Sequence, residues 1–393
     1  MYTVKKHNKY EKTKKTKKTK KTKKTKKKYA NQTKLNIKTF GIKPQYSNKD
    51  IIINYAIYKK CAATANAFFK TYKPLSISKA IIKACNSIIH NYNSKDFPIH
   101  LLQSHTNTNM NLNEVIAKKA NSFTGKHTQV DPLLHVNKSQ SSNDSFYTTS
   151  FITIAIYFKD FIQDLKNLLD QFKLIKPRFS KHTKMGKTHL VNAIPIKYTD
   201  QINGYIGQIQ QCLNVCNITL KQLYEIPAGL TMVGNGDNAP YGFDDKMIKL
   251  LRKEFKLPLR KSNHPFTSLS SFNAIVNCNQ NLSLFASNFR KIAFDVNIMY
   301  GNEEIVIPKI SIGSSFKPSK VNCTVCESVQ MNTIKVMGNT HEVVSANSKG
   351  NLQLNVFIPL ATFNTLESIE LLKYSVQLFI KGLLSDIKMN DKT

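Results

Sequence analysis

Apolar residues recur at helical spacing over most of the chain after residue 28. Ile77, Ala80, Ile81, Ala84 and Ile88 follow one another at the intervals that place side chains on one face of a helix. Strand patterns are few and short, as at 304–307. The sequence therefore predicts a mainly all-α protein built as a bundle of long helices. Helices are expected over 55–72, 77–92, 111–121, 145–175, 201–223, 282–300 and 352–387.

Two kinds of feature interrupt this helical pattern. Pro359 predicts a kink or break within 352–387, because proline lacks the backbone N–H that an inner helical position donates. Loops rich in glycine, asparagine and proline separate other helices at 229–242, 312–322 and 345–351. Polar catalytic groups are expected on such loops, since loops at helix ends carry function more often than helix interiors do.

The positive charge is concentrated at the N-terminus. The chain of 393 residues has a formal net charge of +34, and residues 1–28 contribute +14 of it through a Lys-Lys-Thr repeat. Such a segment is predicted to be a disordered tail, which is either simply solvated or an electrostatic tether to RNA or an acidic membrane. Nearly all basic residues are lysines, whereas nucleic-acid sites depend largely on arginine. A nucleic-acid partner is therefore not expected beyond weak attraction of the tail.

The seven cysteines indicate a reducing, cytoplasmic compartment, because their number is odd and their spacing irregular. Cys323 and Cys326 form a Cys-x-x-Cys motif that could be half of a metal or redox site. No second pair follows at zinc-ribbon spacing, so neither a metal site nor a cofactor is predicted. The sequence shows no signal-peptide pattern and no apolar stretch long enough to span a membrane.

Five polar runs stand between the apolar segments. Each run alone is most simply a helix cap or a structural loop, as Ser-Ser-Asn-Asp before a helix illustrates. The runs are 104–114, 136–144, 186–190, 313–322 and 350–356.

In this order the runs resemble the fumarase/aspartase superfamily, over about residues 29–384. The run 313–322 is similar to the superfamily signature Gly-Ser-Ser-x-x-Met-Pro-x-Lys-x-Asn. Thr188-His189-Leu190 and the run 137–144 have the form found in class II fumarases, where aspartases differ. The resemblance implies the reversible hydration of fumarate to (S)-malate, a step of the tricarboxylic acid cycle.

The resemblance also implies residue roles. Ser314 would be the base that removes a proton from carbon, and Lys320 and Asn322 would stabilise the aci-carboxylate intermediate. His189 would deliver a proton to the departing hydroxyl through water, with Glu327 orienting its ring. The residues that would hold the substrate dicarboxylate are Ser104, Thr106, Ser141, Ser142, Asn143, Thr188 and Ser315.

A homotetramer follows from the same resemblance, with each active site built from three subunits. One chain would give Thr106 and 141–143, a second His189, and a third the loop 314–322. The expected domains are an N-terminal lyase domain at 29–130 and a central helical bundle at 131–384. Residues 385–393 would be a remnant in place of the family's C-terminal domain.

The chain departs from the family pattern at several points. The Ser104–Thr106 loop is two residues shorter and has His105 where the family has glycine, which puts the role of Ser104 in question. Lys317 and Cys323 replace a methionine and a proline of the signature, and 131–134 lacks the family's second anion site. Two alternatives remain open: another lyase of the superfamily, such as aspartase, or a degenerate, non-catalytic relative whose basic tail binds nucleic acid.

Overall fold

The computed structural model describes residues 48–124, 128–309, 317 and 320–390. Most of these residues are helical and the strands are short, which confirms the all-α prediction. The helices are α2 (Asn48–Phe68), α3 (Ser76–His90), α4 (His105–Asn121), α5 (Ser142–Ile175), α6 (Tyr198–Leu223), α7 (Phe243–Phe255), α8 (Pro265–Ser270), α9 (Asn273–Gly301), α10 (Thr324–Asn347) and α11 (Ile358–Phe379).

The strands form three two-stranded sheets at the edges of the helical body. The longest pair is an antiparallel hairpin, whereas β3 and β4 pair in parallel and β5 and β6 antiparallel. The strands are β1 (Thr183–Thr188), β2 (Val191–Lys197), β3 (Glu225–Ile226), β4 (Arg260–Lys261), β5 (Ile305–Val306) and β6 (Lys388–Met389). Short helical turns lie at Ser94–Asp96, Leu101–Gln103, Pro132–Val136, Lys176–Phe179 and Ile380–Leu384.

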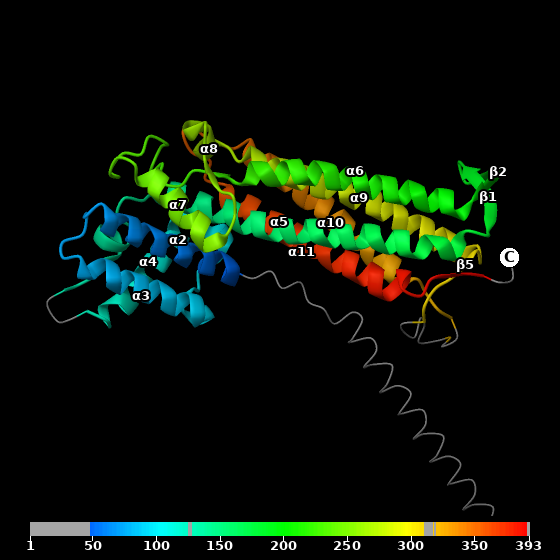
Figure 1. Cartoon of the computed structure of the whole chain (residues 1–393), viewed down its shortest axis with the longest axis horizontal. Helices are drawn as coiled ribbons and strands as arrows, with labels where there is room; N and C mark the ends of the chain where they lie inside the picture. The colour runs from blue at the N-terminus through cyan, green and yellow to red at the C-terminus, as the bar shows by residue number, and fades with distance from the viewer. Residues whose placement is uncertain (1–47, 125–127, 310–316, 318–319, 391–393) are drawn as a thin grey trace, which may run out of the picture.

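Helices α5, α6, α9, α10 and α11 lie side by side as one elongated bundle (Figure 1). Its core contains aromatic rings from three of these helices. Phe289 on α9 lies 5.2 Å from Phe285 and 5.1 Å from Phe379 on α11, measured between ring centroids. Phe161 on α5 lies 5.5 Å from Phe285 and so joins the same cluster. Burial of these large rings supplies much of the apolar area that stabilises the bundle.

The two ends of the bundle differ. Helices α2, α3, α4 and α7 pack together at one end, beside the start of α5 (Figure 1). The β1–β2 hairpin and the β5 strand lie at the opposite end (Figure 1). An antiparallel bundle therefore carries loops at both ends, and these loops are separated by the length of the helices.

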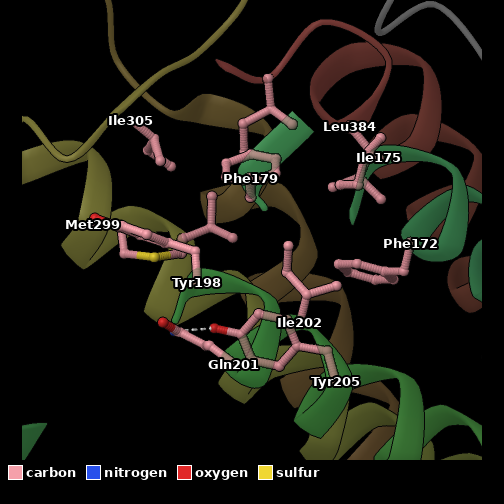
Figure 2. A pocket seen from close by; sticks show the side chains of 12 residues that line it. Phe172, Ile175, Phe179, Tyr198, Gln201, Ile202, Tyr205, Met299, Ile305 and Leu384 are labelled. Carbon is pink, nitrogen blue, oxygen red and sulfur yellow. Dashed lines mark hydrogen bonds between the residues drawn. The ribbon is translucent and has the colours of Figure 1, made fainter. Parts of the chain in front are cut away.

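A small apolar pocket of about 30 Å³ lies at the hairpin end of the bundle. Figure 2 shows the side chains that line it. A hydrogen bond of 2.5 Å from Gln201 to the Tyr205 hydroxyl ties down two of the polar side chains at its edge (Figure 2). A cavity this small and apolar offers a dicarboxylate neither room nor polar partners. We interpret it as a packing defect and not as a substrate site. It is lined by Phe172, Ile175, Phe179, Tyr198, Gln201, Ile202, Tyr205, Val296, Met299, Ile305, Leu384 and Ile387.

Several predicted boundaries need correction. Helix α4 begins at His105, six residues before the predicted start at 111, and α9 begins at Asn273, before the predicted 282. The predicted helix over 352–387 begins only at Ile358, so the break expected at Pro359 is confirmed: residues 352–357 are not helical, and Pro359 occupies the first turn of α11, where a missing N–H costs nothing. Helices α7 and α10 and the hairpin were not among the predicted elements.

Replacing Phe289 by alanine tests the aromatic core. The substitution should lower the free energy of unfolding by about 3–5 kcal/mol, since it leaves a cavity among buried rings. Leu174→Ala, at an exposed position of α5, is the control and should change it by less than about 0.5 kcal/mol. Chemical denaturation of both variants measures the difference, and equal effects would contradict this description of the core.

Candidate active site

The first candidate site group lies at the start of α5. Ser141 is the N-cap residue, and its hydroxyl accepts the backbone N–H of Asn143 at 3.1 Å. The carboxylate of Asp144 in turn accepts the backbone N–H of Ser141 at 2.9 Å. This reciprocal capping box fixes the turn that carries Ser142 and Asn143. The polar run is thus a helix cap, and it also presents two half-buried polar side chains.

The start of α4 meets the start of α5. Ser104 caps α4 by accepting the Thr106 N–H at 3.1 Å, and the Thr106 and Ser142 hydroxyl oxygens are 3.4 Å apart. His105 Nε2 lies 3.2 Å from Asn143 Oδ1. Two helix N-termini, each with positive dipole ends and free N–H groups, therefore face one region. Such a pair favours the binding of carboxylate groups.

The glycine-rich loop after β3 holds Asn143 in place. The Asn143 side-chain amide donates to the carbonyl of Met232 at 2.7 Å. The same loop is also held by Asp144, which accepts the Gly229 N–H at 3.1 Å. Asp144 thereby joins the cap of α5 to the loop that orients Asn143.

Two buried ionisable groups, Lys59 of α2 and Asp144, lie beneath this region. Burial raises the pKa of Asp144 to about 7, although the backbone N–H groups that it accepts and the charge of Lys59 act in the opposite direction. Burial likewise lowers the pKa of Lys59 to about 7, and Asp144 opposes that shift. Each group favours the charged form of the other, so the floor of the site is held by one electrostatically coupled pair.

Asn137 connects Lys59 to the rest of the floor. Its side-chain oxygen accepts from Lys59 Nζ at 3.0 Å and from the amides of Asn109 and Asn113 at 3.2 Å each. Tyr55 extends the network by donating to Asn109 at 2.7 Å. Helices α2 and α4 are therefore tied to the polar run before α5 through buried hydrogen bonds, which set the geometry of the cap.

Thr188 and His189 lie elsewhere, at the tip of the β1–β2 hairpin. Thr188 pairs with Val191, so His189 and Leu190 form the two-residue turn, with φ of 53° and 64°. Both residues are exposed. Helix α5 has 34 residues and separates this hairpin from Asn143 by roughly 50 Å at 1.5 Å per residue.

The third group precedes and begins α10. Lys320 and Glu327 are exposed, and Asn322 is half-buried between them. The Tyr300 hydroxyl donates to the Val321 carbonyl at 2.8 Å and so fastens this segment to α9. Glu327 lies in the first turn of α10, where its N–H donates to the Cys323 carbonyl at 3.2 Å. Ser314 and Ser315 lie outside the described residues.

Among the described residues, one chain thus brings together Ser104, Thr106 and 141–143. It places two other sets apart from them: Thr188 with His189, and Lys320 with Asn322 and Glu327. Helix α10 has 24 residues, about 36 Å, and it ends near the start of α5. That end is located by the Tyr147 hydroxyl of α5, which donates to the Asn355 carbonyl, and by Asn355, whose amide donates to the Ala346 carbonyl at 3.0 Å. The segment at Lys320 lies at the other end of α10.

The buried floor was not found from the sequence. Lys59 follows Tyr55 by four residues within an otherwise apolar helical face, and a lysine on such a face was the available signal.

In the part of the chain that the structure describes, no group of three or more His, Cys, Asp or Glu side chains could hold a metal ion. Among the same residues, no helix is long and apolar enough to cross a membrane.

Comparisons with known proteins identify the family to which the chain belongs. A family model described as "Lyase" matches residues 19–338. The match begins within the segment 1–28, so the proposed tail boundary stays a prediction. The class II fumarate hydratase of Rickettsia prowazekii is 37% identical over 374 residues, which are 92% of this chain and 81% of that protein. The class II fumarate hydratase of Chlamydia caviae is 34% identical, with the same coverage.

A solved structure shows the same fold. The crystal structure of the class II fumarase from Schistosoma mansoni superimposes with a TM-score of 0.82 at 30% identity, covering 88% of this chain and 77% of that one. The long helical bundle and its polar helix ends are thus those of a lyase. The chain belongs to the lyase family and, within it, groups with the class II fumarate hydratases.

Asp144→Asn tests the buried floor of the site. The amide keeps the shape of the carboxylate but directs N–H groups at backbone N–H donors, and it leaves Lys59 without its countercharge. The free energy of unfolding should fall by about 3 kcal/mol. The control is Asp170→Asn, whose side chain is exposed in α5 and should have an effect near zero. Denaturant titration at neutral pH measures both, and a loss in the Asp144 variant no larger than in the control would contradict the role given to Asp144.

Proposed function

We propose that the chain is a fumarate hydratase, which reversibly adds water to fumarate to give (S)-malate. The observation that carries the proposal is the meeting of the α4 and α5 N-termini, where Thr106, Ser142 and Asn143 surround one polar region. The class II fumarate hydratases among its relatives support the reaction. The substrate is a small dicarboxylate, and the proposed chemistry uses side chains without a cofactor.

The helix N-termini supply the carboxylate site. Their free N–H groups and dipoles attract negative charge, and the Thr106 and Ser142 hydroxyls and the Asn143 side chain add neutral hydrogen-bonding groups. Because Asn143 is held by Met232 and His105, its orientation is fixed before substrate binds. Pre-oriented polar groups cost little reorganisation when charge develops on the substrate.

Proton transfer is carried out by the residues of the hairpin and of the segment before α10. Ser314 acts as the base at carbon, and Lys320 and Asn322 stabilise the negative charge that develops on the carboxylate oxygens. His189 passes a proton to the departing hydroxyl through water, and Glu327 orients the imidazole. Ser104, Ser141, Thr188 and Ser315 complete the set, the first two by capping the helices that form the carboxylate site.

These roles require more than one chain, because α5 separates Asn143 from His189 by roughly 50 Å. We therefore propose a homotetramer in which three subunits build each site. Helix α10 supports this by exposing Met331, Ile334 and Met337 on one face. Gly338 lies on the same helix, where an added Cβ would meet nothing within 4 Å. An apolar face with open space beside it fits close packing against another subunit's helix.

The compartment that we propose is the cytoplasm. All seven cysteines are free thiols in this structure, as expected for a reducing environment. The enzyme would act there in the tricarboxylic acid cycle.

The first test is the reaction itself. Purified protein mixed with malate should produce the ultraviolet absorbance of fumarate. Asn143→Ala should lower kcat/KM on the order of 10²-fold, since it removes a positioned polar group at the substrate. Asn167→Ala, an exposed asparagine in the last third of α5, is the control and should retain activity. If the protein releases ammonia from aspartate and malate gives no fumarate absorbance, the chain is an aspartase and the proposed function is wrong.

The second test addresses the shared site. Asn143→Ala and His189→Ala should each keep only on the order of 1% of the activity. Refolding them together should restore about a quarter of the wild-type activity, because random assembly of a symmetric oligomer pairs intact regions in that fraction of sites. The matched control combines Asn143→Ala with Thr106→Ala. These two defects lie in the same region, so this mixture should stay inactive. Recovery in neither mixture, together with a monomeric mass by light scattering, would refute the shared site.

A further inference from the structure

Two cysteine thiols meet at the start of α10. Cys323 is the N-cap residue and Cys326 is the third residue of the helix. Their side chains are hydrogen-bonded to each other. Cys326 is fully buried, whereas 4% of Cys323 remains exposed, next to the exposed Lys320 segment. The Cys-x-x-Cys motif therefore forms a thiol pair that the proposed reaction does not use.

The local geometry permits a disulfide. Side chains three residues apart in a helix have Cβ atoms about 5–6 Å apart, and a disulfide needs roughly 3.5–4.5 Å. Cys323 has φ of −81° and ψ of 57°, outside the helical region. Since its backbone is not part of the regular helix, rotation at Cys323 is available to bring its Cβ closer to that of Cys326 while α10 stays helical.

The two thiols differ in reactivity. The hydrogen bond from Cys326 lowers the pKa of Cys323, which is the direction that favours a thiolate. The same hydrogen bond, followed by burial, raises the pKa of Cys326. The N-terminal dipole of α10 favours a thiolate at Cys323 as well. One cysteine is thus suited to attack a disulfide and the other to resolve the product.

The pair lies between two candidate catalytic residues. Asn322 immediately precedes Cys323, and Glu327 immediately follows Cys326. The Glu327 N–H also donates to the Cys323 carbonyl at 3.2 Å. A bond between the two sulfurs would pull on the backbone that positions both residues. Displacement of a positioned group by about 1 Å can cost on the order of 10²-fold in rate.

We propose that Cys323 and Cys326 are a site of reversible oxidation by small anionic disulfides of the glutathione class, and that the disulfide formed there lowers the activity. The effect on activity rests on the proposed fumarate hydratase function. Lys320 is exposed three residues before Cys323, and its positive charge favours an anionic partner of this kind.

The exchange balances in two steps. The Cys323 thiolate attacks one sulfur of the small disulfide, whose S–S bond breaks, and one small thiol leaves after taking up a proton. Cys326 then loses its proton and attacks the Cys323 sulfur of the mixed disulfide. The second small thiol leaves with that proton. Two protein thiols are oxidised, and one small disulfide is reduced to two thiols.

The test equilibrates the full chain with mixtures of reduced and oxidised glutathione. After an acid quench and alkylation in denaturant, mass spectrometry should find Cys323 and Cys326 joined, and fumarate hydration should have fallen by about tenfold or more. Dithiothreitol should restore both. The matched control pair is Cys212 and Cys216, buried four residues apart on α6, which should remain alkylated throughout.

Two variants separate the attack on glutathione disulfide by Cys323 from the resolution of the mixed disulfide by Cys326. Cys323→Ser lacks the attacking thiolate and should keep its activity at every glutathione ratio. Cys326→Ser lacks the resolving thiol and should accumulate the glutathione adduct on Cys323. The proposal is overturned if both wild-type thiols stay alkylated, if the disulfide leaves activity unchanged, or if Cys323→Ser is inactivated equally. A reduced chain that forms the disulfide but never hydrates fumarate contradicts the proposed function and still supports the oxidation site.

Discussion

The stiffness and length of α5 constrain everything else in this molecule. A continuous helix of 34 residues holds its two ends roughly 50 Å apart, with candidate site residues near each end: Asn143 at one and the hairpin with His189 at the other. The packing of α5 against α6 and α11 and the rings around Phe161 leave it no freedom to bend the ends together. Side chains at opposite ends of such a helix can meet only when a second copy of the chain packs alongside in the opposite direction. A long bundle therefore favours active sites shared between chains, because side-by-side packing supplies the second and third groups.

At the α4 end of this bundle, the positions of the candidate substrate-binding side chains depend on Asp144. Its buried carboxylate accepts N–H groups from Ser141 and Gly229, which belong to segments far apart in the sequence. A carboxylate has two oxygens with about four acceptor sites, so it can satisfy donors from both segments at once. The cost of burying that charge is reduced by Lys59, which Asn137 holds in place. The side chains that would contact substrate, Thr106, Ser142 and Asn143, can then be neutral, because the buried groups Lys59 and Asp144 hold the helix cap that positions them.

The sequence foretold the fold better than the complete site. The helical stripe at 77–92 predicted Ser76–His90 closely, because its apolar residues face one core. The pattern missed α10, whose exposed Met331 and Ile334 add apolar residues outside the buried stripe and blur the period. It also missed the start of α4, where polar residues follow the Ser104 cap. The cap at Ser141 was predicted from local residue types alone.

The pairing of Lys59 with Asp144 was beyond the sequence because nothing local connects residues 85 positions apart. Capping depends on three or four neighbouring residues, so the sequence displays it directly. The electrostatic coupling of two buried groups depends on how α2 packs against α5, which is a property of the whole fold. The lysine alone could also have extended along the apolar surface with its ammonium in water.

His105 shows how a departure from the family pattern is absorbed. Where the resemblance led us to expect glycine, the histidine is the first residue of α4, and the extended Ser104 before it, with φ of 179°, needs no left-handed conformation. The ring is buried against Phe146, with centroids 6.0 Å apart, and hydrogen-bonds Asn143. Burial lowers its pKa, so the ring stays neutral near pH 7 and adds no charge beside the carboxylate site. His105 therefore contacts the Asn143 side-chain oxygen while the Met232 carbonyl accepts from its amide, and the two contacts together fix the orientation of Asn143.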